Sequence, residues 1–482
     1  MSSSKALRGF LAAGAAVATL CAAMPASAAV TIIINNLNGP GVGFNDATPA
    51  VPVGGNAGTT VGQQRLNAFA YAANVWGANL TSSVPVVINA QFSALSCTAT
   101  SATLGSAGAT QVFREFANAP KSGTWYSYAL ANKIAGFYLG TLNAAQISAN
   151  FNVNLGQANC LAGQGWYYGL DNNEGSQIDF VAVLLHEMGH GLGFQTFTSG
   201  STGNFLQGFP AIWDHYLMDN ANGILWKDMT AAQRVSSAIG VNRLVWTGAN
   251  VTAGAPSVLR QGLPGVTISG PAAGPMANAQ LQAGEASFGA SLTQAGLFNE
   301  VMPVVSDTTS AAGTGKGCGP LTTNDARAVN GKIALIDRGA CGFVVKVKNA
   351  QNAGAVGVLI ADNAAGPPAG LGGSDPTITI PAVRITLADG NSLKTQLATR
   401  SRTNSGVYAR MGLFGTQLAG TDVLGRVLMY TPNPFVSGSS VSHYDTTATR
   451  NLLMEPAING DLTIAVVPPI DLTLPLFTDI GW

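Results

Sequence analysis

Two histidines four residues apart, with a glutamate directly after the first, are the residues of this sequence best suited to chemistry. They lie in SQIDFVAVLLHEMGHGLGF, residues 176–194, as His186, Glu187 and His190. On an α-helix, side chains at i and i+4 stand on one face, so both imidazoles can bind one metal ion. Glu187 then lies beside the ion, where a carboxylate can act as general base on a zinc-activated water. The spacing therefore predicts a catalytic zinc site on a helix.

The segment also has the local signals of a helix. Ser176 is a suitable N-cap, Asp179 places negative charge in the first turn, and an apolar run follows from Phe180. Gly193 is suited to end the helix. We therefore expect a buried helix that begins near Ser176 and stops at Gly193.

A catalytic zinc takes three protein ligands and leaves a fourth position for water, so a third ligand must lie elsewhere. The compact metzincin pattern H-E-x-x-H-x-x-G-x-x-H is excluded, because Thr196 occupies its last position. Three candidates for the third ligand remain: Asp214, which would make an aspartate-type site, the adjacent His215, and His443.

The surroundings of His443 resemble those of leishmanolysin-like metzincins. The resemblance rests on Ser442-His443-Tyr444-Asp445, on Met454 eleven positions after the histidine, and on the final LFTDIGW. It implies that His443 is the third zinc ligand, ahead of Asp214, and that Met454 forms a Met-turn beneath the metal without binding it. It also implies an α+β fold with a zincin (metzincin-like) catalytic domain. Tyr444 is a candidate for stabilising the oxyanion, although no spacing argument supports it.

Residues 251–402 are rich in Gly, Ala and Pro, and part of this segment resembles a protease-associated (PA) domain. The resemblance rests on NGKIALIDRGACGFVVKVKNAQNAGAVGVLIADN, residues 330–363, with Cys318 upstream. It implies a non-catalytic α/β insert that binds protein segments or restricts substrate access. Asp337 and Arg338 within it are interpreted as a structural ion pair or turn contact.

The predicted domain order is therefore a signal peptide (1–28), a first part of the catalytic domain (29–250), the PA-like insert (251–402) and a second catalytic part (403–482). In the catalytic parts we expect a strand at 30–35, a helix at 61–80 and a strand at 86–92. Residues 147–153 are predicted as a strand along the cleft edge, and strand-like patterns resume at 437–456.

The composition and the amino terminus indicate an exported protein. Lys5 and Arg8 precede an apolar run and an A-x-A cleavage site that ends at Ala28, and no later stretch is long and apolar enough to span a bilayer. Net charge is zero and only 10% of residues are charged, which argues against nucleic acid as a partner. For the four cysteines beyond the signal peptide we favour the pairs Cys97–Cys160 and Cys318–Cys341, each within one predicted domain.

Together these features predict a secreted or periplasmic zinc endopeptidase that is monomeric, holds one Zn²⁺ and hydrolyses protein or peptide substrates. It would have no membrane association after cleavage of the signal peptide, and calcium binding has no support in the sequence. The alternative is an exported protein-binding or adhesion protein that uses the PA-like domain, with zinc serving only a structural role. Glu187 favours the enzyme, because a purely structural zinc site does not need that carboxylate.

Overall fold

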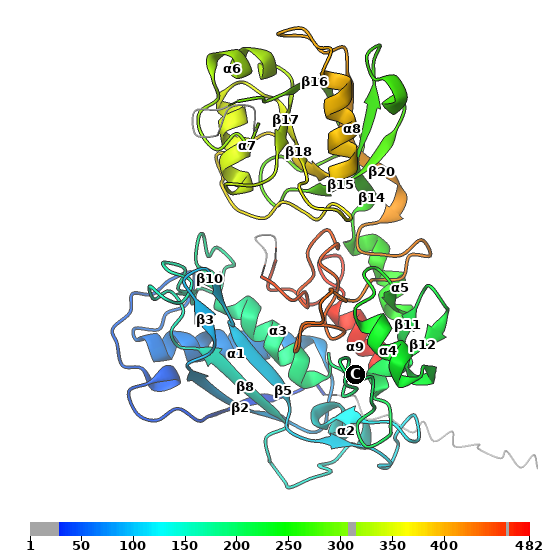
Figure 1. Cartoon of the computed structure of the whole chain (residues 1–482). Helices are drawn as coiled ribbons and strands as arrows, with labels where there is room; N and C mark the ends of the chain where they lie inside the picture. The colour runs from blue at the N-terminus through cyan, green and yellow to red at the C-terminus, as the bar shows by residue number, and fades with distance from the viewer. Residues whose placement is uncertain (1–27, 307–314, 459–461) are drawn as a thin grey trace, which may run out of the picture.

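The molecule consists of two lobes, each with its own hydrophobic core (Figure 1). The computed structural model describes residues 28–306, 315–458 and 462–482. The core of the larger lobe is built from buried residues between Val30 and Leu259 and between Val427 and Ile480. The cores of the smaller lobe draw on residues between Val266 and Leu413. Two segments far apart in the sequence therefore fold into one lobe.

A four-stranded mixed sheet of the order β1-β2-β8-β5 lies in the larger lobe. Its strands are β1 (Ile32–Asn36), β2 (Val86–Ser93), β8 (Ile147–Asn152) and β5 (Gly105–Ala109). The first three strands are parallel, and β5 runs antiparallel to β8. The predicted strand at 147–153 is present as β8, but its predicted place at the edge is wrong, because β5 pairs with it on the side away from β2. The sequence of β5, GSAGA, lacks the β-branched and aromatic residues that mark a strand.

Two helices pack on each other and on this sheet: α1 (Val61–Asn79) and α3 (Phe180–Leu192). The predicted helix at 61–80 is confirmed, and the hydroxyl of Thr60 caps it by accepting a hydrogen bond from the amide of Gln63. Figure 1 shows α3 running beside β5. The helix with the two histidines therefore lies next to the outermost strand of the sheet.

The start of α3 differs from the prediction, whereas its end does not. Asp179, not Ser176, is the N-cap, because its carboxylate accepts hydrogen bonds from the amides of Val181 and Ala182 at 2.7 and 3.1 Å. Gly193 follows the last turn with φ of 135°, a conformation that L-residues rarely adopt. The helix thus ends where the sequence predicts, with almost every residue buried.

Shorter elements complete the larger lobe. The helices are α2 (Tyr128–Ala135), α4 (Ala231–Ala238), α5 (Ala249–Val258) and α9 (Thr473–Ile480), and the short strands are β3 (Cys97–Thr98), β4 (Ser101–Ala102), β6 (Val112–Phe113), β7 (Tyr126–Ser127), β9 (Trp166–Tyr167), β10 (Ile178–Asp179), β11 (Leu217–Asp219), β12 (Ile224–Leu225) and β13 (Leu244–Trp246). Residues 437–456, predicted as strand-like, instead form turns and bends with one isolated bridge, from Tyr444 to Met429. Their conformation is set by buried polar contacts, described below, and not by a sheet.

The smaller lobe is a closed seven-stranded barrel flanked by helices. In barrel order its strands are β14 (Gln261–Ser269), β15 (Gln280–Glu285), β19 (Ala382–Ile385), β18 (Gly357–Ala361), β17 (Ile333–Asp337), β16 (Leu297–Pro303) and β20 (Tyr408–Leu418), and its helices are α6 (Thr323–Val329), α7 (Phe343–Asn352) and α8 (Leu387–Leu397). Strands β17, β18 and β19 are parallel; α7 connects β17 to β18, an irregular segment connects β18 to β19, and α8 follows β19.

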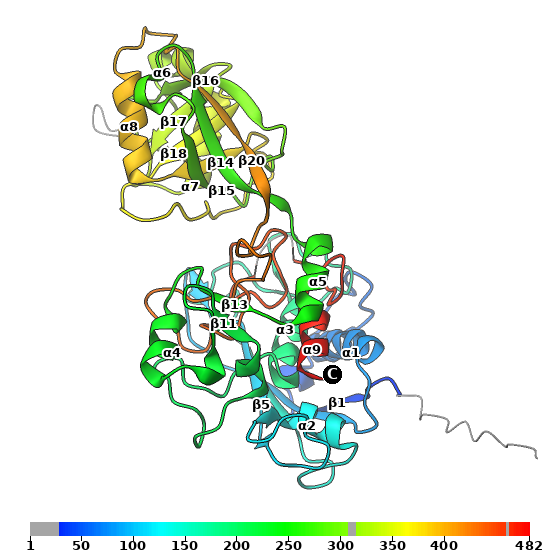
Figure 2. The same ribbon diagram turned by 90° about the vertical axis from the view of Figure 1, so that its right-hand side faces the viewer.

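The chain enters and leaves the barrel at adjacent points. Strands β14 and β20 pair antiparallel from Gln261 opposite Leu418 to Ser269 opposite Tyr408. Just outside them the amide of Ala419 donates to the carbonyl of Arg260 at 2.9 Å. Figure 2 shows this paired neck leading down to α5. The barrel spans 261–418, whereas the predicted insert is 251–402. That the chain is divided into this insert and a catalytic domain stays a prediction.

Both predicted disulfides are confirmed, because Cys97 is bonded to Cys160 and Cys318 to Cys341. Residues 1–27 of the predicted signal peptide (1–28) lie outside the described part of the chain. Within the described part, no helix combines the length and the apolar character needed to cross a membrane.

The close packing of α3 on β8 makes a testable prediction at Gly191. A Cβ there would lie 2.3 Å from Cγ2 of the buried Ile147. We expect Gly191→Ala to destabilise the protein by about 1–3 kcal/mol, because overpacking outweighs the better helix propensity of alanine. Chemical unfolding of the variant measures this change.

Two controls accompany that measurement. Gly39, around which a Cβ would meet nothing within 4 Å, should tolerate alanine within about 0.5 kcal/mol. In the Ile147→Ala background, Gly191→Ala should lower the free energy of unfolding less than it does in wild type. Full stability of Gly191→Ala would show that this contact does not limit the helix position.

Candidate metal centre

Three histidine side chains meet in the larger lobe. The Nε2 atom of His190 lies 3.1 Å from Nε2 of His186 and 3.1 Å from Nε2 of His443. His186 and His190 come from one face of α3, and His443 comes from the turn-rich segment 437–456. These three residues form the group of His, Cys, Asp and Glu side chains, within the described residues, that could hold a metal ion. The structure thus brings together the three residues predicted as ligands.

The other ring nitrogen of each histidine contacts a backbone carbonyl. Nδ1 of His186 lies 2.7 Å from the carbonyl oxygen of Leu453, Nδ1 of His190 lies 2.8 Å from that of Phe194, and Nδ1 of His443 lies 2.8 Å from that of Ser439. A carbonyl can only accept a hydrogen bond, so each Nδ1 must carry the proton. In each neutral ring Nε2 is then unprotonated and carries a lone pair, and the three lone pairs face one another.

This arrangement fits a cation. Burial holds the pKa of His186 and His443 below the ordinary value and lowers that of His190 to about 3, so the rings stay neutral. Three converging lone pairs repel one another unless a Lewis acid lies between them. Nitrogen ligands about 2.0–2.1 Å from a tetrahedral zinc are about 3.3 Å apart, close to the observed separations. The donor set and the spacing therefore match a zinc ion.

Glu187 lies at the junction of α3 and β5. It is buried, with 7% of its surface exposed, and burial raises the pKa of its carboxyl to about 8. The amide of Ala107 in β5 donates a hydrogen bond to this carboxylate, which partly offsets the shift. A Cβ at Gly105 would lie 3.0 Å from Oε1 of Glu187, so glycine there lets the strand approach the carboxylate. The general base predicted from the motif is thus held against the outermost strand.

A four-residue turn, Leu452 to Glu455, lies directly beneath α3. Its own hydrogen bond joins the amide of Glu455 to the carbonyl of Leu452 at 3.1 Å, and the amide of Tyr444 donates to the carbonyl of Met454 at 2.9 Å. A Cβ at Gly189 would meet Sδ of Met454 at 2.7 Å, so the thioether packs against the bare backbone of the helix. Met454 thus lies against the helix between His186 and His190, and its role as a Met-turn stays a prediction.

Tyr444 does not have the exposure that oxyanion stabilisation needs. The residue is fully buried, and its hydroxyl donates to the carbonyl of Leu472 at 3.0 Å. Its ring packs edge-on against Phe194 at 5.1 Å between centroids. Tyr444 is therefore a packing residue behind His443.

The two other candidates for the third ligand lie outside the histidine cluster. Asp214 is fully buried and accepts hydrogen bonds from the hydroxyls of Thr196 and Thr198 and from the amide of Ala211. His215 contacts the hydroxyl of Thr124 through Nε2 at 3.1 Å. Asp214 thus braces the loop that follows α3, and its oxygens are committed to that loop.

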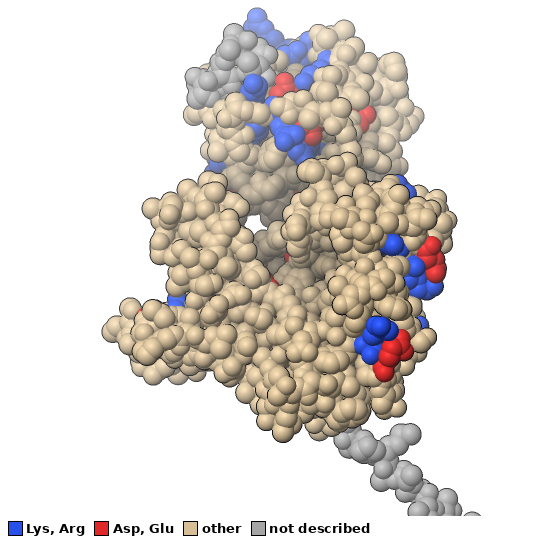
Figure 3. Space-filling model, turned by 60° about the horizontal axis from the view of Figure 1, so that its bottom comes forward, with Lys and Arg blue, Asp and Glu red and all other residues tan. Residues whose placement is uncertain are grey.

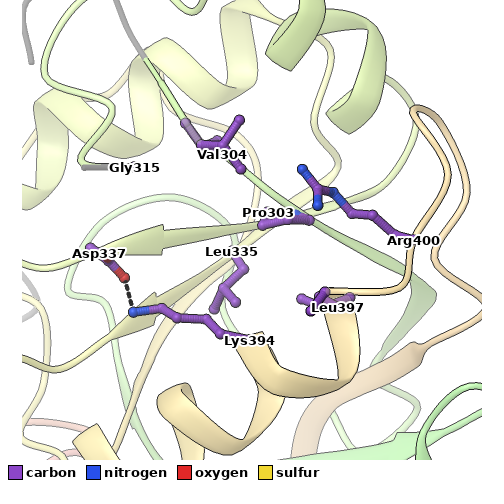
Figure 4. Close-up of a pocket in the computed structure, with 10 residues that line it drawn as sticks. Pro303, Val304, Gly315, Leu335, Asp337, Lys394, Leu397 and Arg400 are labelled. Atoms are coloured by element: carbon purple, nitrogen blue, oxygen red, sulfur yellow. Dashed lines mark ion pairs between the residues drawn. The ribbon is translucent and has the colours of Figure 1, made fainter. Parts of the chain in front are cut away.

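A separate pocket lies in the barrel lobe (Figure 4). Its volume is about 180 Å³, and apolar residues such as Val304 and Leu335 line it beside an ion pair of Asp337 with Lys394, 2.5 Å long. Arg338, next to Asp337 in sequence, pairs with Asp362 at 2.8 Å. Asp337 and Arg338 therefore form structural ion pairs, as expected, but each with a different partner.

The surface of the larger lobe carries few charges. Figure 3 shows a face that is hollowed at its centre and rimmed mostly by residues that are neither basic nor acidic. This agrees with the low share of charged residues in the chain, 10%.

Sequence reasoning missed the groups that orient the site. The carbonyls of Leu453, Phe194 and Ser439 fix the three rings, and the amide of Ala107 contacts the carboxylate. Backbone groups are present at every residue, so no residue type marks them in advance. Only the chain path shows which of them face the histidines.

Comparison with known proteins identifies a PA domain in the barrel lobe, with residues 301–393 matching the model of that family. The minor extracellular protease Vpr of Bacillus subtilis (strain 168) is 28% identical over 137 residues, which cover 28% of this chain and 16% of Vpr. The chain therefore spans about a sixth of the length of this curated relative. The predicted PA resemblance is confirmed, and the molecule is an α/β protein with mixed sheets plus a PA domain.

Two solved structures of aminopeptidases also show similarity. The aminopeptidase from Aneurinibacillus sp. strain AM-1 is 26% identical, with 33% of this chain and 32% of that chain covered and a TM-score of 0.23. The zinc aminopeptidase BSAP from Bacillus subtilis is 22% identical, with 34% of this chain and 36% of that chain covered and a TM-score of 0.22.

The predicted relationship to leishmanolysin-like metzincins is wrong. The family model that matches is that of the PA domain, and the curated relative Vpr is an extracellular protease. The short motifs behind the prediction follow from the needs of a helical zinc site, since two imidazoles one turn apart and a third from elsewhere suit such a site in any family. Spacing of this kind indicates chemistry and not ancestry.

The cap of α3 makes a testable prediction about pH. Burial raises the pKa of Asp179 from 3.8 to about 6, against the hydrogen bonds from the amides of Ala182 and Val181. The folded protein therefore holds this proton more tightly than the unfolded chain does, and ionisation between pH 4 and 6 lowers stability. The free energy of unfolding of Asp179→Asn, relative to that of wild type, should therefore increase by at most about 3 kcal/mol as the pH rises through this range.

Guanidinium unfolding of both proteins at pH 3.5, 5 and 7 measures this difference. Asparagine keeps the capping oxygen but cannot ionise, so the two proteins should be closest in stability at pH 3.5. A variant that loses stability relative to wild type as the pH rises would show that the charged cap stabilises α3 despite its burial.

Proposed function

We propose that this protein is a zinc-dependent peptidase whose metal is held by His186, His190 and His443 and whose general base is Glu187. One observation carries the proposal: three neutral imidazoles, each fixed by a hydrogen bond from Nδ1 to a carbonyl, direct their Nε2 lone pairs at one point. Hydrogen bonds of this kind are typical of metal-binding histidines, because they orient the ring and increase its basicity.

Zinc bound there would lower the pKa of water and polarise the carbonyl of a peptide bond. The positive charge of the ion would favour the ionised form of Glu187 despite its burial, so its carboxylate would accept a proton from the attacking water and pass it to the nitrogen of the departing amine. Its place against β5 suits this role, because the hydrogen bond from the Ala107 amide limits the positions the carboxylate can take. Met454 would support the site through Gly189 without binding the metal.

We infer that the enzyme is an endopeptidase that binds its substrate as an extended strand. β5 is the last strand of the sheet order, so one edge of it is not paired with another strand among the described residues. Such an edge binds a peptide through main-chain hydrogen bonds. These bonds can form anywhere along a polypeptide and do not require a free terminus, which favours internal cleavage. Protein or peptide substrates follow from the same geometry.

Other features of the chain are consistent with this proposal. The relative Vpr is described as an extracellular protease, and two disulfides suit an oxidising compartment. We therefore propose an exported enzyme with a catalytic part on both sides of the PA-containing barrel; a monomeric state remains a prediction from the sequence. Cleavage after Ala28 remains a prediction from the sequence.

The proposed ligands and base can be separated by two substitutions. His443→Ala should lose stoichiometric zinc, because two imidazoles bind the ion much more weakly than three. Glu187→Gln should keep the metal and lose about 10²- to 10⁴-fold in casein hydrolysis, since general acid–base catalysis contributes that much. Metal analysis of each purified variant, paired with an activity assay, measures both effects.

His215→Ala is the matched control, since this histidine lies outside the cluster and should change neither zinc content nor activity. Removal of zinc by a chelator should abolish hydrolysis, and added zinc should restore it. Glu187→Gln that cleaves casein as fast as wild type would refute Glu187 as the general base. Wild type that binds zinc but does not cleave casein would favour a binding protein with a structural metal.

The mode of cleavage is tested with blocked peptides. A peptide acetylated at its amino terminus and amidated at its carboxyl terminus should be cut internally, because strand pairing with β5 does not need free ends. The comparison substrate is an amino acid p-nitroanilide with a free amino group. Hydrolysis of the anilide without hydrolysis of the blocked peptide would identify an aminopeptidase instead.

A further inference from the structure

A buried carboxylate stands behind one of the proposed metal ligands. Asp471 is 2% exposed and lies just before α9. Its Oδ2 accepts a hydrogen bond from the amide of Leu453 at 2.7 Å, and its Oδ1 accepts one from the amide of Thr473 at 2.7 Å. The mechanism described above does not use this residue. A buried carboxylate is expensive to desolvate, so its retention calls for a physical account.

The contact with Leu453 leads directly to the metal centre. The amide of Leu453 donates to Asp471, and the carbonyl of Leu453 accepts from Nδ1 of His186, also at 2.7 Å. One residue of the turn therefore connects the carboxylate to the imidazole. The turn is also closed within itself, because the amide of Leu452 donates to Oε1 of Glu455 at 2.9 Å.

We propose that Asp471 is a positioning residue for His186, acting through the backbone of Leu453. The proposal rests on the function proposed above, because it takes His186 as a metal ligand. Asp471 fixes the direction of the Leu453 carbonyl, and that carbonyl fixes the tautomer and the ring orientation of His186. The amide and the carbonyl of Leu453 belong to two different peptide groups, so Asp471 acts on His186 by holding the backbone conformation of this residue.

Geometry selects aspartate at this position. Each oxygen of the side chain faces a backbone N–H, one from Leu453 in the turn and one from Thr473 at the start of α9, so two acceptors are needed on one side chain. Asparagine offers one acceptor and would place its NH₂ group against the other amide. Asp471→Asn therefore keeps the size of the side chain but breaks one of the two contacts.

The test measures zinc affinity, which a merely structural role would not change in the folded protein. Apo protein is titrated with Zn²⁺ against a chromophoric chelator, with folding verified by near-UV circular dichroism. Asp471→Asn should raise the dissociation constant for zinc by about 10- to 100-fold, as loss of a group that orients a ligand does. The matched control is Asp325→Asn, a buried carboxylate in the barrel lobe that also accepts backbone amides, from Val305 and Ser306. It should bind zinc as wild type does.

A double-mutant cycle with His186→Ala shows whether the effect passes through that ring. If it does, Asp471→Asn should weaken zinc binding far less in the His186→Ala background than in wild type. Equal weakening in both backgrounds, or wild-type affinity of Asp471→Asn, would overturn the proposal. Wild type that takes up no zinc would instead refute the proposed function itself, so the two failures are distinguishable.

Leu453→Pro is the second variant, for the case in which Asp471→Asn does not fold. Proline removes the amide that Asp471 accepts but keeps the carbonyl that His186 contacts, and it is favoured at the second position of a turn such as Leu452 to Glu455. It should weaken zinc binding in the same range. Wild-type affinity in this variant would likewise overturn the proposal.

Discussion

The lone pairs of three histidines repel one another, and the larger lobe must hold these side chains together against that repulsion. Neutral imidazoles whose Nε2 atoms lie about a hydrogen-bond length apart gain nothing from one another. The fold must therefore hold them in place through other contacts, and it does so at Nδ1. Each of the three contacts uses a backbone carbonyl, so the precision of the site depends on the path of the main chain and not on neighbouring side chains.

Three separate pieces of chain supply these carbonyls, and a buried carboxylate is close to two of them. Asp471 holds the turn that carries Leu453, and Asp214 braces the loop after Phe194 through Thr196 and Thr198. Glycines let these pieces approach α3, since Gly189 accommodates Met454 and Gly105 accommodates Glu187. Small residues on the helix and strand thus matter as much as the histidines themselves.

The sequence was sufficient for features that depend on residue type at short range. The helix from the H-E-x-x-H run and its end at Gly193 could be predicted this way. The PA domain was predicted from a resemblance, and the two disulfides from the predicted division into domains. The proximity of His443 to the other histidines was also anticipated, although its role as a ligand remains a proposal. The start of α3 was missed, because Ser176 and Asp179 are both good caps and only tertiary packing chooses between them.

Other features had no local signal. Strand β5 is made of glycine, alanine and serine, so nothing in its composition indicates the outermost strand of the sheet. Segment 437–456 alternates like a strand but has no neighbouring strand to pair with, and buried polar contacts decide its path instead. Family membership was misjudged, since motifs imposed by zinc chemistry recur in unrelated proteins.

The neck formed by β14 and β20 bears on how the polypeptide folds. Bringing together the ends of a flexible loop of roughly 160 residues costs about 4 kcal/mol more than closing a two-residue turn, because the entropy lost grows with the logarithm of loop length. A barrel that folds by itself removes that difference, since its first and last strands are already neighbours. The ribosome releases residue 443 only after the barrel has been made. A domain that contributes no ligand can thereby shorten the search by which the last histidine finds the other two.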